Sequence, residues 1–165
     1  MQKNDQARII KNTNKIRLLI IVSSGFFLLL DQFLKWQTTH NWNQAKLINK
    51  YFGWQPFLNS GAAFSLPMPN WLVLILSFPI IALVTFLLIR ERRKTYNFLV
   101  WTLILTGAIS NFFDRLFYQY VIDYFAFITG IINLGDILIV SGLILYLLRW
   151  KNKKFEINYD EKQIN

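Results

Sequence analysis

The chain has no cysteine, a single histidine and few charged residues. Without cysteine, its 165 residues can form no disulfide, no thiol nucleophile and no cysteine-metal site. His40 has no second histidine with which to share a zinc ion, and we expect neither a metal nor another cofactor. Charged residues make up only 16% of the chain, whereas hydrophobic residues make up 54%. This composition is poor in charge for a soluble domain and favours a membrane protein.

The apolar residues gather in runs long enough to cross a bilayer. We predict one all-α membrane domain, residues 1–165, with an extracytoplasmic loop region between its first two helices and a flexible cytoplasmic tail at 151–165. The four predicted transmembrane helices cover residues 18–36, 71–89, 95–113 and 131–148. The first is long enough only if it carries Asp31 and Lys35, which lie four apart and can pair on one helical face. The fourth requires Asp136 inside it.

The net charge of +9 does not indicate a nucleic-acid partner, because the basic residues flank the apolar runs. Residues 1–17, 90–94 and 149–165 together hold 14 of the 18 Lys and Arg side chains. Positive charge concentrates on the cytoplasmic side of bacterial membrane proteins, so we expect both termini to be cytoplasmic. Four aspartates fall instead at the opposite ends of the predicted spans: Asp31, Asp114, Asp123 and Asp136.

The stretch 107–136 concentrates polar and ionisable groups where the flanking sequence is apolar. An ionisable side chain inside hydrocarbon costs about 2.5–3.5 kcal/mol on insertion scales, so such groups in a small space indicate function. Two carboxyls that share a proton can catalyse proteolysis, but neither can then have a fixed cationic partner. Asp31 has Lys35 one turn later, and Asp114 has Arg115 beside it. Asp123 and Asp136 have no basic neighbour and are the pair that remains; the 12 residues between them form a loop that can bring them together.

The segment between the first two spans is aromatic and polar. Residues 37–58 are either an interfacial aromatic belt or a loop that lies over the site and contacts lipid. Residues 59–65, NSGAAFS, are mostly small and allow close backbone approach, so they can receive an extended substrate strand. Asn59 is either a residue that binds such a strand or a turn residue.

Five short motifs, in this order on four spans, resemble lipoprotein signal peptidase, also called signal peptidase II. They are DQFLK (31–35), NSGAAFS (59–65), GAISNFFDR (107–115), VIDYF (121–125) and NLGD (133–136). Each motif alone is weak, but the ordered set is specific. The resemblance implies an aspartic endopeptidase of the bacterial inner membrane that cuts prolipoproteins before a diacylglyceryl-modified cysteine. We also expect membrane lipid around the site, no nucleic acid and no obligatory protein partner.

The resemblance also implies roles for individual residues. It assigns catalysis to Asp123 and Asp136, and it favours substrate binding for Asn59. Other supporting residues are Asp31, Lys35, Gly61, Asn111, Asp114, Arg115 and Asn133. From spacing alone, Asn111 and Arg115 can either bind substrate backbone or tie loops together, and Asn133 can orient Asp136. The chain departs from the family pattern at Thr106, Ser110 and Gly135, where the residues stay small.

Two other functions fit parts of the sequence. A Ser–Lys protease could use Lys35 with Ser60 or Ser65, but it would leave four aspartates without a role. A small transporter or assembly subunit could use the carboxylates to bind ions or protons. Such a protein needs acids through the membrane depth, whereas these lie on one side.

Overall fold

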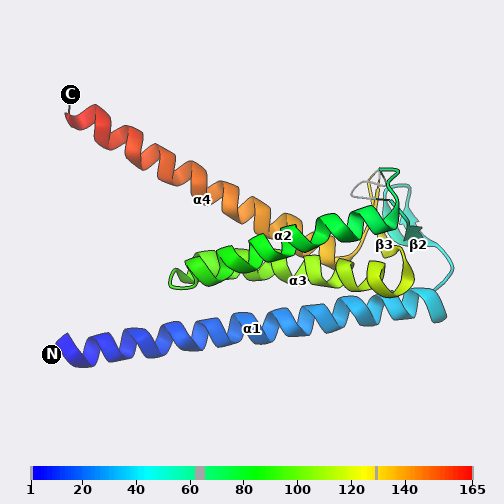
Figure 1. The fold of residues 1–165 in the computed structure, drawn as a ribbon, viewed down its shortest axis with the longest axis horizontal. Coiled ribbons are helices and arrows are strands. Elements are labelled where there is room, and N and C mark those ends of the chain that lie inside the picture. Colours follow the sequence, from blue (N-terminus) through cyan, green and yellow to red (C-terminus); the bar gives the residue numbers. More distant parts are fainter. Residues whose placement is uncertain (1, 62–65, 129, 165) are drawn as a thin grey trace.

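Four long helices and one small antiparallel sheet make up the fold. The structure, a computed structural model, describes residues 2–61, 66–128 and 130–164. The helices are α1 (Gln2–His40), α2 (Asn70–Glu91), α3 (Thr95–Tyr118) and α4 (Leu134–Ile164), and the strands are β1 (Lys46–Asn49), β2 (Phe52–Asn59), β3 (Val121–Phe127) and β4 (Gly130–Ile132). The sheet lies at one end of the long axis, and the N-terminal end of α1 and the C-terminal end of α4 lie at the other (Figure 1).

Helix α3 is central and contacts α1, α2 and α4. A small apolar core joins Val84 of α2 to Val100 and Ile104 of α3, with Leu145 of α4 packed against it. Most other large apolar side chains on the helices face outward, as they do in a protein surrounded by lipid. Three helical segments are long and apolar enough to cross a membrane: Ile10–His40, Asn70–Glu91 and Thr95–Tyr118. The fourth predicted span, residues 131–148, is not among the segments found in the described residues, and it stays a prediction.

Helices α3 and α4 come close together where both carry glycine. A methyl group added at Gly107 would overlap the backbone carbonyl of Gly135. Seven residues further along α4, a methyl group at Gly142 would press on the side chain of Ile104. Small residues at a helix crossing let the two backbones come together, which is a common way of packing helices in membranes. This crossing fixes the start of α4 against α3.

The expectation of an all-α fold is wrong for residues 46–59 and 121–132. They form a four-stranded sheet in the order β1-β2-β3-β4, with every neighbouring pair antiparallel. Aromatic and branched side chains in these segments favour strands, but in a membrane-like sequence they also resemble an interfacial belt. The predicted loop between Asp123 and Asp136 is consequently a hairpin, β3–β4, followed directly by α4. Four residues of the predicted substrate segment, 62–65, lie outside the described residues.

Candidate active site

Asn133 connects Asp123 to Asp136. It immediately precedes α4, where its side-chain oxygen accepts from the backbone N–H of Asp136 at 2.9 Å, while Asp136 Oδ2 accepts from the backbone N–H of Asn133 at 3.2 Å. This reciprocal pair is a capping box, which satisfies N–H groups that the first turn of a helix leaves open. The side-chain N–H of Asn133 donates to Asp123 Oδ1 at 2.6 Å. One asparagine therefore orients both predicted catalytic carboxyls, and it does so from the end of the helix rather than from its face.

Strand β3 presents Asp123 beside β2. Phe57 of β2 is the direct partner of Asp123 in the sheet, and directly paired residues project to the same face. From that face, Asn59 donates its side-chain N–H to Asp123 Oδ2 at 3.2 Å. Asp123 is 2% exposed, so both of its oxygens are held by amide donors in a nearly dry environment. The sheet positions this carboxyl, and the local sequence pattern did not predict a sheet.

Helix α3 holds the second carboxyl through Asn111, which donates from Nδ2 to Asp136 Oδ1 at 2.8 Å. The other end of the same amide, Oδ1, accepts from Lys35 Nζ at 3.1 Å. An ammonium group can only donate, so Lys35 determines which way the Asn111 amide faces. Lys35 thus acts on Asp136 through one intervening side chain.

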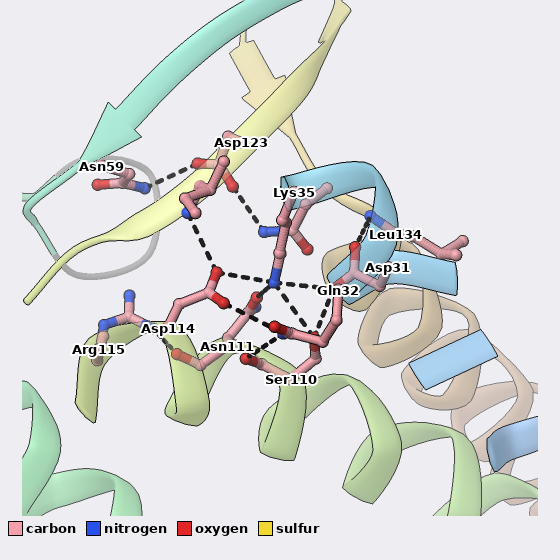
Figure 2. A network of polar contacts seen from close by, with 12 residues as sticks. Asp31, Gln32, Lys35, Asn59, Ser110, Asn111, Asp114, Arg115, Asp123 and Leu134 are labelled. Atoms are coloured by element: carbon pink, nitrogen blue, oxygen red, sulfur yellow. Dashed lines mark hydrogen bonds and ion pairs between the residues drawn. The ribbon is translucent and has the colours of Figure 1, made fainter. Parts of the chain in front are cut away.

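Lys35 lies at the centre of a buried polar network (Figure 2). Its Nζ is 2.8 Å from Asp31 and 2.9 Å from Asp114, and the lysine side chain is 1% exposed. The predicted Asp31–Lys35 pair is confirmed. A lysine buried this deeply needs partners for its charge, and two carboxylates plus the hydroxyl of Ser110 at 3.2 Å supply them.

The prediction that Arg115 neutralises Asp114 is wrong. Asp114 pairs with Lys35, whereas Arg115 donates to the backbone carbonyls of Asn111 at 3.5 Å and Gly61 at 3.3 Å. Lys35 is on another helix, so spacing along the sequence could not show this partner. Asp114 also accepts from the backbone N–H of Ile122 at 3.2 Å, next to Asp123. It therefore ties β3 to α3.

Arg115 and Gly61 secure the chain that follows β2. Gly61 N–H donates to Asn59 Oδ1 at 3.1 Å, while the Gly61 carbonyl accepts from Arg115. Asn59 consequently has two functions in this structure: its oxygen forms a turn and its N–H₂ group contacts Asp123. The turn alternative for Asn59 is therefore confirmed, and the turn holds its amide beside the Asp123 carboxyl. That Asn59 binds a substrate strand stays a prediction.

Three network residues were not among the predicted site residues: Gln32, Ser110 and Tyr124. Gln32 donates to Asp114 at 3.1 Å and to Ser110 Oγ at 2.8 Å. Ser110 donates to Asp31 Oδ2 at 2.5 Å. Tyr124 donates to Asp31 Oδ1 at 2.7 Å. All three lie within motifs quoted above, but their side chains are uncharged, so the sequence offered no reason to select them.

The departures from the family pattern have physical explanations. Ser110 supplies a hydroxyl to the buried network, and the Thr106 hydroxyl donates to the Thr102 backbone carbonyl at 2.8 Å. At Gly135, an added methyl group would lie 3.0 Å from Asn133 Oδ1 and 3.2 Å from Asn111 Oδ1. It would crowd the two amides that hold the carboxyls, so glycine suits this arrangement.

Burial and mutual repulsion alter the proton affinity of the site. Removal from water raises the pKa of Asp123 to about 7, and the nearby negative charge of Asp136 adds to the increase. The hydrogen bonds from Asn59 and Asn133 oppose it. At neutral pH, Asp123 can therefore still hold a proton, which an ordinary aspartate has lost. Two carboxyls, one carrying a proton, can act together as acid and base.

Fold and site together define a helical membrane protein with two coupled carboxyls beside a small sheet. A solved bacterial membrane enzyme has a similar fold, with a TM-score of 0.76 and 19% identity over 82% of this chain and 89% of that chain. A second solved bacterial membrane enzyme matches with a TM-score of 0.70 over 80% of this chain and 92% of that chain.

Sequence comparison defines the class more closely. The model of the signal peptidase (SPase) II family matches residues 23–151. Lipoprotein signal peptidase of Serratia marcescens is 33% identical over 75% of this chain and 79% of its own. That of Xylella fastidiosa (strain M12) is 32% identical over 80% of this chain and 87% of its own. The chain belongs to the signal peptidase II family, and it is a peptidase of the bacterial membrane.

Proposed function

We propose that the protein is an aspartic endopeptidase that removes signal peptides from prolipoproteins. The observation that carries this proposal is the capping asparagine, Asn133, which bonds Asp123 and Asp136 at the same time. A shared orienting residue brings two carboxyls into one chemical unit. Family membership supports the substrate class, since the relatives are lipoprotein signal peptidases.

The proposed reaction uses one carboxyl as base and the other as acid. Asp136, ionised, takes a proton from water as the oxygen attacks the scissile carbonyl carbon. Asp123, protonated, donates to the carbonyl oxygen, so a neutral tetrahedral intermediate forms. As the intermediate collapses, Asp123 takes a hydroxyl proton back and Asp136 gives the proton that it took from water to the leaving nitrogen. The C–N bond breaks, and both carboxyls return to their starting states. The raised pKa of Asp123 supports its assignment as the acid.

Activity should fall as the pH rises through about 7. The folded protein holds the Asp123 proton to a higher pH than an ordinary aspartate does, and deprotonation removes the acid. The charges that face Asp123 are Asp136 on α4, Lys35 on α1 and Arg115 on α3. The measurement is kcat/KM against pH, which reports groups of the free enzyme. A flat profile from about pH 6 to 9 would contradict the proposed acid.

The substrate is proposed to be cut before a cysteine that carries a diacylglyceryl group. The described part of the sheet exposes large apolar side chains close to Asp123, including Phe57 and Leu58. Burial of acyl chains contributes about 0.8 kcal/mol per CH₂, so partial burial already supplies much of the binding free energy. Purified protein should cleave diacylated precursor at least about 100-fold faster than unmodified precursor, measured as kcat/KM. Equal rates would show that the lipid is not recognised.

Both termini are proposed to lie in the cytoplasm, with the carboxyl pair near the opposite face. The sheet lies at one end of the molecule, and the N-terminal end of α1 and the C-terminal end of α4 lie at the other (Figure 1). This arrangement agrees with the distribution of basic residues. In this cysteine-free chain, Arg92→Cys should resist an impermeant thiol reagent in intact cells, whereas Lys46→Cys should react. Labelling at position 92 would reverse the proposed topology.

A Ser–Lys protease is not supported. The described partners of Lys35 Nζ are Asp31, Asp114, Ser110 and Asn111, and Ser60 is not one of them. Ser110, the hydroxyl that Lys35 does reach, is fully buried and donates to Asp31. Ser65 lies outside the described residues. The transporter alternative is not favoured, because the chain belongs to a peptidase family.

A further inference from the structure

Tyr124 links three elements that meet at the active site. Its backbone belongs to β3 directly after Asp123, and neighbouring residues of a strand project to opposite faces. Asp123 therefore faces Asn59 and Asn133, while the Tyr124 side chain runs to the other side, toward α1. Tyr124 is completely buried, although its hydroxyl is polar. A buried hydroxyl needs hydrogen-bond partners, and those of Tyr124 show which elements it holds together.

The hydroxyl of Tyr124 lies between α1 and the first residue of α4. It donates to Asp31 Oδ1 at 2.7 Å and accepts from the backbone N–H of Leu134 at 3.0 Å. The same N–H also reaches Asp31 Oδ1 at 3.1 Å. The three groups form a closed triangle, which fixes the first turn of α4 against α1. Asp136 lies two residues after Leu134 in that turn.

The aromatic ring of Tyr124 is fixed from the sheet side. Trp54 of β2 stacks on it, with ring centroids 4.8 Å apart and an interplanar angle of 21°. Trp54 in turn donates its indole N–H to the Trp42 carbonyl at 3.1 Å. Stacking holds the ring without the hydroxyl, so the two parts of this side chain can be tested separately. Loss of the hydroxyl alone should leave the sheet packing intact.

We propose that Tyr124 is a positioning residue for the carboxyl pair. Its hydroxyl holds the start of α4, which carries Asp136, in place relative to β3, which carries Asp123. The proposal rests on the proposed function of these two aspartates. Asn133 bonds the two carboxyls directly, but it sits at the junction of β4 and α4 and moves with α4. The Tyr124 hydroxyl joins the strand of one carboxyl to the helix of the other, and through Asp31 it fixes both to α1. Catalysis by positioned groups is sensitive to displacements of about 1 Å.

Tyr124→Phe removes only the hydroxyl. We expect kcat to fall at least about tenfold with KM changed less than about twofold, because the substrate surface is untouched while the two carboxyls are not held in register. We also expect the alkaline limb of the kcat/KM profile to move to lower pH. Looser carboxyls repel each other less and admit water, and both changes lower the pKa of Asp123 toward its usual value. A residue that only stabilised the fold would not move this limb.

Tyr118→Phe is the matched control, since Tyr118 is half exposed and stacks on Tyr120 away from the network. It should keep kcat, KM and the pH profile of the unmodified protein. If Tyr124→Phe lowers only the melting temperature, with kcat per folded molecule and the pH limb unchanged, the proposal is wrong. If Tyr124→Phe proves too unstable in detergent, it is assayed in isolated cell membranes at low temperature, where the same pH shift must appear. Asp123→Asn assayed alongside tests the dyad itself, so failure of the function and failure of the positioning role are distinguished.

Discussion

Asp123→Asn and Asp136→Asn should each reduce cleavage of diacylated precursor by at least about 10⁴-fold while the protein remains folded. Each change keeps the shape of the side chain but removes a group that gives or takes a proton. If the two carboxyls work as one unit, as proposed, the double substitution should be scarcely slower than either single one. The measurement is single-turnover cleavage by detergent-purified protein, with the melting temperature recorded for every variant.

Asp114→Asn is the control for that experiment. It makes the same Asp-to-Asn change at a nearby position. Asp114, however, bonds Lys35, Gln32 and the Ile122 N–H rather than Asn133. It should lower thermal stability before it lowers the rate per folded molecule. If Asp114→Asn abolishes cleavage in folded protein while Asp123→Asn keeps a near-normal rate, the pair would be Asp114 and Asp136 instead.

Lys35→Met should destabilise the protein by about 3–5 kcal/mol, since it leaves two buried carboxylates without a cation. Asp31 and Asp114 are both fully buried, and Lys35 is the cation that the structure places against them. The free energy of unfolding, or the melting temperature in detergent, measures the loss. Activity should fall as well, because the Asn111 amide loses the contact that directs its N–H₂ group to Asp136.

Lys46→Met provides the comparison for a lysine on the exposed edge of the sheet, and it should cost less than about 0.5 kcal/mol. Neutralising the stranded carboxylates should restore part of the stability: Lys35→Met combined with Asp31→Asn and Asp114→Asn should melt above Lys35→Met alone. A Lys35→Met variant as stable as the unmodified protein would show that the buried ion pairs are not what holds α1 to α3.

Local sequence signals predicted the helices well but predicted the sheet poorly. Long uncharged runs identify α2 and α3 because a bilayer requires a minimum apolar length. The pairing of Asp31 with Lys35 is also local, one turn of α1, and could be predicted for that reason. Strands β1 to β4 are short, and their aromatic residues have two explanations in a membrane protein.

The candidate site divides in the same way. Elimination by local charge selected Asp123 and Asp136, and the structure brings both onto Asn133. The prediction that Arg115 neutralises Asp114 failed because the partner, Lys35, is on another helix. The spacing of residues within one segment does not show contacts between distant segments. Gln32, Ser110 and Tyr124 were missed for a related reason, since each bonds a carboxyl on another element. Gln32 of α1 reaches Asp114 of α3, and Ser110 of α3 and Tyr124 of β3 both reach Asp31 of α1.

The close crossing of α3 and α4 at Gly107 bears on how a mutational scan of this protein is interpreted. A side chain there forces α4 outward, and Asp136 travels with it. Substitutions at Gly107 can therefore mimic the loss of Asp136, the proposed catalytic base, even though a glycine has no side chain to offer a substrate. A map of inactivating substitutions would mark position 107 together with position 136, and only the melting temperature would separate a lost proton donor or acceptor from a displaced helix.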